Sequence, residues 1–535
     1  MKNHHRTKDG LSLDNKKAHE SDHLSWSRRG FLQSVGLTTS MSLLLGKLPL
    51  RAFTSSAMDY VGETDRVLIL IRLAGGNDGL NTVVPLFDYG RYQQLRTTVA
   101  IPPGELTELK NGLAMPQLTP DFFNLWNNDL MKIVQGVGYP EQNLSHFRST
   151  DIWSTASDAQ FIEPSGWLGR LITLDDPEIT IHPPEHPAAV QIGNSGNLTF
   201  NNSDNVNLSF QVSNTNQLFQ IVNEGKFFPV EDLPECLHGS QIEFVRNLAN
   251  QTFRYADVIK MAYEKAENSL EYTASSLANQ LAIVARLIKG GLRTSLYMVT
   301  LDGFDTHANQ PNQHMNLLRA LSSNVKEFFA DLKTSDNDKR VLAMTTSEFG
   351  RRPQQNASNG TDHGAAAPLF VFGPEVNGAD IIGQHPDLND LDMAGNLKFG
   401  IDFRQVYRTI LTDWLCFPDT DTDDILGRDF EALDLGFNCS TTRIVDHAAA
   451  ISEIGMITHH LRHFTFTIDA VQSVYSKVKV YDLQGREVVR LYRGILNSGL
   501  NKFDLHTSDY NMAAGMYIFT VKAGSRLITR KFVVV

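Results

Sequence analysis

The stretch RVLILIRLAGGNDGLNTVV, residues 66–84, begins as a near-continuous apolar run and breaks at Gly75 and Gly76. Such a run is typical of a strand that is buried on both faces of a parallel sheet. The same form, an apolar strand followed by a loop with Gly, Asp, Glu or His, recurs at residues 130–140, 294–307, 339–351 and 367–376.

Segments with the 3.6-residue period of amphipathic helices lie among these strands. Residues 274–291 and 314–333 are two examples, and the first ends on paired glycines. Strands that alternate with helices predict an α/β fold, with a mostly parallel sheet flanked by helices. The Asn- and Ser-rich segment 199–223 is interpreted as a surface excursion of this domain.

Polar side chains gather in the loops that follow the predicted strands, which is where parallel sheets bind ligands. They are Asn77, Asp78, Ser145, His146, Asp302, Asp305, His307, Glu348, Asp362 and His363. Carboxylates and imidazoles from several strand ends suit a divalent metal. A serine beside such a metal can act as a nucleophile.

Each of these residues also has a purely structural interpretation. Asp302 would cap a turn at Gly303, and Asp362 would form an Asx-turn. His314 would cap the helix that it opens. His307, with two Asp residues within five positions, is harder to explain in this way. The collection therefore indicates a site more strongly than any single member does.

Seven ordered motifs between residues 65 and 437 carry a resemblance: GGNDGLNTVVP, NLSHF, GWLGRL, DGFDTH, SEFGR, GTDHG and DFRQVYRTILTDWL. Together they resemble the family of domain of unknown function 1501. That family is similar to the alkaline phosphatase superfamily of phosphatases, sulfatases and phosphomutases. The resemblance implies an alkaline-phosphatase-like domain over residues 58–437, with a nucleophile beside one or two divalent metals (Zn, Mn, Mg or Ca).

The resemblance also implies roles for individual positions. The implied metal ligands are Asp78 (with Asn77 as the alternative), Asp302, His307, Asp362 and His363. The implied catalytic residues are Ser145 (with Ser149 as the alternative), His146, Glu348 and Arg351 (with Arg352 as the alternative). Ser145 would attack phosphorus or sulfur, Glu348 would be a ligand or an outer base, and Arg351 would neutralise the anionic ester.

Departures from the family's pattern leave two functions open. Where related enzymes carry T-S-D-H-G, this chain has Glu348 and Phe349, and phenylalanine cannot bind metal. The interval from Asp302 to His307 is one residue longer than usual, and no C-x-P-x-R motif of a formylglycine sulfatase is present. One function is a metal-dependent hydrolase of phosphate or sulfate esters. The other is a non-catalytic surface protein that binds a ligand such as a glycan.

The N-terminal segment SWSRRGFLQSVGLTTSMSLLLGKLPLRA, residues 25–52, resembles a twin-arginine export signal. Its apolar run is interrupted by Lys47 and is too short for a permanent membrane span. Residues 1–57 are therefore expected to be a signal peptide. Twin-arginine export carries folded proteins, many of them loaded with a cofactor in the cytoplasm.

The C-terminal segment has the period-two alternation of short strands, which predicts a small β-sandwich over residues 464–535. Its motifs D-x-x-G-R-x-V, AAGMYIFTV and KFVVV resemble a type A sorting domain of the type IX secretion system, although the usual Tyr-Pro-Asn-Pro opening is missing. Residues 438–463 are expected to be a linker, with His459, His460 and His463 solvated. The twin-arginine and type IX machineries are the expected partners, and the destination is the cell surface or the medium, by way of the periplasm.

The composition of the chain narrows the classes of function and of fold that remain. A formal net charge of -12 argues against a general affinity for nucleic acid. The three cysteines are widely separated and form no C-x-x-C pair, which argues against a disulfide framework but leaves room for one bridge.

Overall fold

The computed structural model describes residues 64–439 and 451–534, with gaps at 177–178, 181–182, 194–195, 213–236, 461, 472–473, 483–486, 497, 509, 511 and 524–525. The expected signal peptide, residues 1–57, lies outside the described residues. The described chain forms two compact units, which divide after Phe437. Strand β15 (Ile451–His460) lies within the segment that was expected to be a linker.

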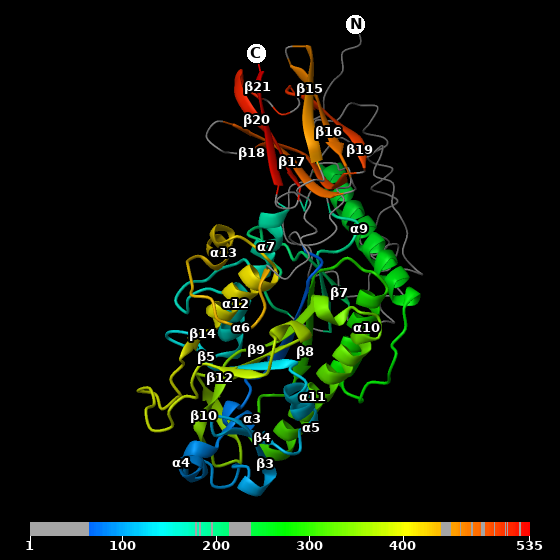
Figure 1. Ribbon diagram of the computed structural model, residues 1–535. Helices are drawn as coiled ribbons and strands as arrows, with labels where there is room; N and C mark the ends of the chain where they lie inside the picture. The colour runs from blue at the N-terminus through cyan, green and yellow to red at the C-terminus, as the bar shows by residue number, and fades with distance from the viewer. Residues whose placement is uncertain are drawn as a thin grey trace. The chain divides into compact units, whose positions relative to one another are not determined.

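The first unit is built around a sheet of order β13-β5-β12-β9-β1-β8-β6-β7, with β14 beside β5 (Figure 1). Only β12 runs antiparallel to its neighbours β5 and β9. The other pairings in this sheet are parallel. The strands are β1 (Val67–Ala74), β5 (Met131–Gly138), β6 (Ala189–Ile192), β7 (Ser209–Val212), β8 (Leu296–Asp302), β9 (Val341–Ser347), β12 (Ala367–Phe372), β13 (Asp380–Ile382) and β14 (Ile401–Asp402).

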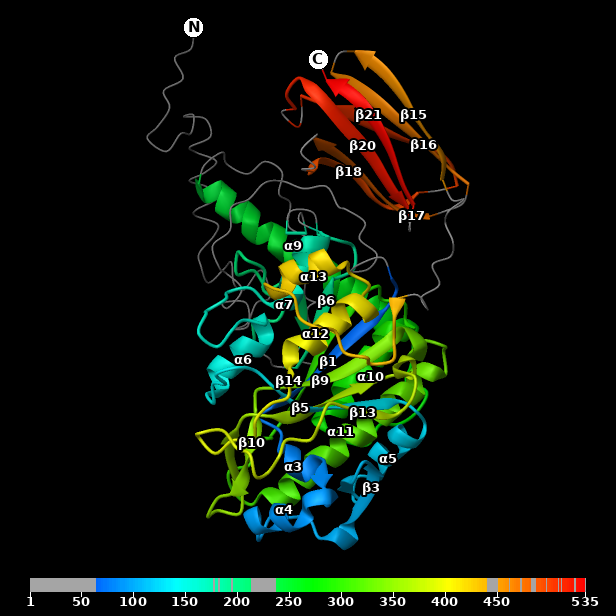
Figure 2. The same ribbon diagram turned by 60° about the vertical axis from the view of Figure 1, so that its left-hand side comes forward.

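Helices cover both faces of this sheet, as Figures 1 and 2 show. One layer contains α5 (Pro120–Asn127), α9 (Leu237–Lys265), α10 (Ser276–Lys289) and α11 (Gln310–Lys333); the other contains α6 (His146–Thr155), α7 (Trp167–Asp175), α12 (Phe403–Thr409) and α13 (Asp419–Leu426). Residues of β1 pack into the core that the first layer forms with the sheet. The predicted α/β fold with a mostly parallel, helix-flanked sheet is confirmed.

Two local expectations need correction. Helix α11 begins at Gln310, four residues before His314, so His314 lies buried within the helix and does not cap it. Part of the segment interpreted as a surface excursion is strand β7, which pairs in parallel with β6 at the edge of the sheet. The remainder of that excursion, from residue 213 onward, lies outside the described residues.

The second unit is the predicted small β-sandwich. One sheet has the order β15-β16-β19 and the other β18-β17-β20-β21. Besides β15, the strands are β16 (His463–Ala470), β17 (Val474–Asp482), β18 (Glu487–Leu496), β19 (Gly499–His506), β20 (Gly515–Ala523) and β21 (Arg526–Val534). The rings of Phe466 and Phe519, one from each sheet, stack with centroids 3.8 Å apart and join the two sheets in a common core.

Two further observations concern the described chain as a whole. Cys416 and Cys439 are both disulfide-bonded, which accounts for the one bridge that the sequence leaves room for. Among the helices of the described segments, none combines the length and the apolar character needed to cross a membrane.

Candidate metal centre

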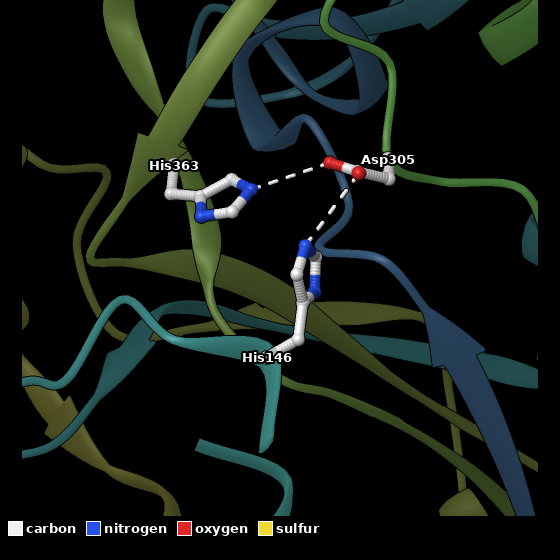
Figure 3. Close-up of side chains that lie close together, drawn as sticks. All are labelled: His146, Asp305 and His363. Carbon is white, nitrogen blue, oxygen red and sulfur yellow. Dashed lines mark hydrogen bonds and ion pairs between the residues drawn. The ribbon is translucent and has the colours of Figure 1, made fainter. Parts of the chain in front are cut away.

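Three imidazoles and one carboxylate meet beyond the carboxyl ends of the central strands. His146 opens helix α6, Asp305 and His307 lie in the loop after β8, and His363 lies in β11 (Thr361–Gly364). In Figure 3 the rings of His146 and His363 both point toward Asp305. Ligand atoms of these three residues lie within 4.8 Å of one another.

The nitrogen atoms that face Asp305 are the Nε2 atoms. His307 Nε2 and His363 Nε2 lie 3.1 Å and 3.2 Å from Asp305 Oδ1. His146 Nε2 lies 3.5 Å from Asp305 Oδ2. The Nε2 atoms of His307 and His363 are 2.9 Å apart. The Nε2 atoms of all three imidazoles thus lie within 3.5 Å of the Asp305 carboxylate.

Each imidazole is held by its other nitrogen. The contacts are His146 Nδ1 to Glu348 Oε2 at 2.5 Å, His307 Nδ1 to Asp362 Oδ1 at 3.0 Å, and His363 Nδ1 to the carbonyl oxygen of Leu144 at 2.8 Å. All three partners are acceptors, so the hydrogen-bond network assigns the proton of each neutral ring to Nδ1. Each Nε2 then directs its lone pair toward the centre. This outer support is typical of histidines that bind metal.

The donor set fits one divalent ion. Bonds of about 2.0–2.1 Å to a tetrahedral ion place neighbouring donor atoms about 3.4 Å apart. The observed separations of 2.9 to 3.5 Å bracket that value. Imidazole and carboxylate ligands suit zinc and manganese. Three residues, His146, Asp305 and His363, would hold the ion, and His307 Nε2 lies beside Asp305 and His363 as a candidate fourth ligand.

The charges around the centre favour the metal-binding protonation states. Partial burial opposes ionisation of Asp305, but the hydrogen bond from Arg351 and the positive charge of its guanidinium outweigh it and lower the pKa of the carboxyl group. Partial burial lowers the pKa of His363 and keeps the ring neutral near pH 7. A hydrogen bond from Asn356, helped by His307, lowers the pKa of Asp362.

Arg351 is buried and fixes the loops around the centre. Its guanidinium donates to Asp305 Oδ1 at 2.7 Å and to the carbonyl oxygens of Gly75, Gly76, Phe304 and Thr361. Only 1% of Arg351 is exposed. The expected role of neutralising a substrate ester therefore does not suit this side chain, and positioning of Asp305 does.

Three of the expected ligands, Asp78, Asp302 and Asp362, lie outside the cluster, and Asp362 contacts His307 Nδ1 instead. Asp78 is fully buried and receives hydrogen bonds from Arg96 Nη1 and Nη2 at 2.6 and 2.8 Å. Asp302 is exposed at the end of β8, and Asp305 faces the imidazoles instead. Asn77, the alternative to Asp78, contacts His314 Nε2 at 2.9 Å. Burial lowers the pKa of His314 to about 4.

The expected catalytic residues also differ in whether they lie at the centre or away from it. Ser145 is exposed at the N-cap of α6, and its side chain makes no capping hydrogen bond. Ser149 is buried, and its hydroxyl contacts Tyr139 Oη and the carbonyl oxygen of Glu348. Glu348 is buried and bridges His146 and Arg72, whose Nη2 lies 2.8 Å from Glu348 Oε1.

Phe349 packs against the imidazoles. Its ring centroid lies 4.4 Å from that of His363 and 5.0 Å from that of His146, and the side chain is buried. Phe349 therefore forms an apolar wall behind two of the imidazoles.

Sequence reasoning did not select Asp305 or Arg72. Asp305 was visible in D-G-F-D-T-H as the carboxylate nearest His307, but the pattern did not decide between it and Asp302. Arg72 is the one charged residue within the apolar run of β1, a signal that a partner such as Glu348 was to be expected.

Comparisons with known proteins agree with parts of this description. Residues 239–436 match the family described as "Protein of unknown function (DUF1501)", and residues 463–535 match the "Secretion system C-terminal sorting domain". No curated protein matches the chain significantly.

Similar solved structures share little sequence with this chain. A protein in the alkaline phosphatase superfamily from Vibrio parahaemolyticus has 10% identity and a TM-score of 0.30, over 89% of this chain and 88% of that one. The PsFucS1 sulfatase from Pseudoalteromonas sp. has 11% identity and a TM-score of 0.30, over 84% and 85%. The lipoteichoic acid synthase LtaP from Listeria monocytogenes has 9% identity and a TM-score of 0.32, over 71% and 78%. Likenesses this low say nothing of activity. The sorting domain at residues 463–535 identifies an exported protein that reaches the cell surface or is secreted.

Proposed function

We propose that the first unit is a metal-dependent hydrolase of phosphate or sulfate esters that acts at the cell surface or in the medium. The observation that carries the proposal is the convergence of three Nε2 atoms on Asp305, each ring fixed at Nδ1 by an acceptor. A bound divalent ion would supply positive charge for the ester oxygens and for the developing negative charge.

Ser145 is the proposed nucleophile. Its hydroxyl is exposed and is not used to cap α6. Both of its chain neighbours contact the cluster, since Leu144 accepts from His363 and His146 contributes Nε2. The first turn of a helix also presents free backbone N–H groups, which favour negative charge.

The proposed reaction proceeds in two transfers. Ser145 Oγ forms a bond to phosphorus or sulfur while the bond to the alcohol oxygen breaks, and the alcohol leaves with a proton. Water then displaces the group from the serine and releases phosphate or sulfate. Glu348 and Asp362 position His146 and His307 in both transfers and do not touch the substrate.

A second candidate function is a non-catalytic binding protein that retains metal. The observation in its favour is Phe349, which removes a potential ligand and closes the space behind His146 and His363. The two candidates differ in whether Ser145 has any measurable role.

Metal analysis followed by an ester screen tests the proposal. We expect the purified full-length protein to hold about one divalent ion per chain, at the cluster of imidazoles around Asp305. His363→Ala should lose most of it, while His385→Ala, a histidine outside the cluster, should not. Failure of the wild type to retain any of a range of divalent ions would contradict the proposal.

The ester screen separates the two candidates. Wild type should hydrolyse aryl phosphates or aryl sulfates, and Ser145→Ala should abolish the reaction with its metal content unchanged. Stoichiometric metal without hydrolysis of any ester would favour the binding protein instead.

A further inference from the structure

Three large apolar side chains are exposed beside the N-terminus of α6. Phe147 is 87% exposed, Phe161 66% and Ile162 88%. We call these three residues the apolar rim. Large apolar side chains that stay exposed lose the stabilisation that burial would give, so a group of them calls for an explanation.

The loop that carries Phe161 and Ile162 is held firmly in place. Arg148 Nη2 donates to the carbonyl oxygens of Asp158 and Ala159 at 3.2 and 3.1 Å, and also to that of Phe161. The carboxylate of Asp158 pairs with Arg404 and, at 3.1 Å, with Arg428. The exposure is therefore a property of an anchored loop and not of a loose one.

The same contacts place the rim next to the candidate site. Phe147 follows His146 directly in α6. The next residue of that helix is Arg148, whose side chain donates to the backbone of the loop. On the other side, the Gln160 amide donates to the carboxylate of Glu141, four residues before Ser145. The loop thus lies along the segment that carries both the proposed nucleophile and one imidazole of the cluster.

We propose that the apolar rim binds the alcohol part of the ester, and that this alcohol carries a ring with an apolar face. This inference rests on the proposed function, because the rim adjoins Ser145 and would receive what leaves from it. Phe147 and Phe161 offer flat faces against which a ring can pack. An aryl ring and the apolar face of a sugar share this chemistry.

Kinetics with matched esters test the rim. Phenyl, hexose and ethyl esters of the hydrolysed acid are compared for wild type, Phe147→Ala, Phe161→Ala and the control Phe87→Ala, which removes a phenylalanine that is 60% exposed elsewhere. We expect Phe147→Ala to raise KM for a ring-bearing ester about fivefold to tenfold, the loss of one ring contact. The ethyl ester, kcat and metal content should be unaffected. If KM rises in Phe147→Ala for the phenyl ester alone, the ring is an aryl ring; if it rises for the hexose ester alone, the ring is a sugar.

Outcomes that overturn the rim differ from those that overturn hydrolysis. If Phe147→Ala changes KM equally for all three esters, or for none of them, the rim is not a ring site. The hydrolase proposal is unaffected by that result. If wild type hydrolyses no ester, calorimetry with phenylphosphonate and a hexose phosphate replaces kinetics. If Phe147→Ala weakens binding and Phe87→Ala does not, the rim is supported as a ring site although the hydrolase proposal is contradicted. If neither compound binds to the wild type, both proposals are contradicted.

Discussion

His307 Nε2 and His363 Nε2 lie 2.9 Å apart, and the partners of both rings direct a lone pair into the space between them. Two lone pairs at this distance repel unless a cation or a proton lies between them. Asp305, 3.1 to 3.2 Å from both nitrogens, adds a negative charge. The arrangement therefore calls for a cation or a proton between the two nitrogen atoms, and metal affinity is the property that tells the two apart.

Gly360 allows this approach. A Cβ atom at Gly360 would lie 2.3 Å from the carbonyl carbon and oxygen of His307, so Gly360→Ala must push the loop of His307 away from β11. We expect metal affinity to fall on the order of tenfold or more, as when support of a ligand is lost. Chelator competition measures it. Gly90→Ala, where a Cβ meets nothing within 4 Å, is the control, and equal affinities of the two variants would contradict the argument.

Glu348→Gln tests the outer support of His146. The substitution keeps the shape but removes the charge that holds His146 Nδ1 and pairs with Arg72. We expect metal affinity to fall about 10–100-fold with the fold retained. The matched control is Glu327→Gln, because the Glu327 carboxylate accepts hydrogen bonds from Thr273 and none from the imidazoles of the cluster. Unchanged affinity in Glu348→Gln would show that His146 does not depend on this carboxylate.

The sequence predicted the fold well because each central strand is a continuous apolar run that ends in a polar loop. The same rule placed His307 in the loop that follows β8, but His363 lies within β11, which was expected to be a loop. It did not separate Asp302 from Asp305, since that choice depends on the turn at Gly303, where φ is 109°. It also could not tell that Asp78 lies against Arg96, because no local pattern encodes which buried charges pair across a fold.

Asp78→Asn distinguishes a structural carboxylate from a metal ligand. Arg96 and Asp78 are both fully buried, so the variant leaves the guanidinium without its counter-charge, at a cost of about 3–5 kcal/mol. Replacing both residues, as Asp78→Asn with Arg96→Met, should cost less than the single change. We expect both variants to keep their metal wherever they fold, as measured by elemental analysis. Loss of metal from the folded double variant would make Asp78 a ligand.

Asp331 anchors α11 to α10 and supplies a pH-dependent part of the stability. Its carboxylate is fully buried, accepts from Lys289 Nζ at 2.7 Å, and also accepts from Asn268 and Ser269. Burial opposes ionisation, but these hydrogen bonds outweigh it and lower the pKa of Asp331. A lowered folded pKa gives stability that is present above the unfolded value of about 3.9 and is lost as the pH falls through the folded pKa.

Asp331→Asn should therefore destabilise the first unit by about 3 kcal/mol at pH 7, because Lys289 is left buried without its counter-charge. The difference from wild type should begin to shrink below about pH 4, where the carboxylate of the unfolded chain takes up a proton, and should continue to shrink as the pH falls through the lowered pKa of the folded one. Urea unfolding followed by tryptophan fluorescence reports on this unit, since no tryptophan occurs after Trp414. Asp390→Asn, at an exposed pair with Lys398, is the control and should change stability by less than about 1 kcal/mol. A cost of Asp331→Asn that is the same at pH 3 and pH 7 would mean that the charge of Asp331 contributes nothing.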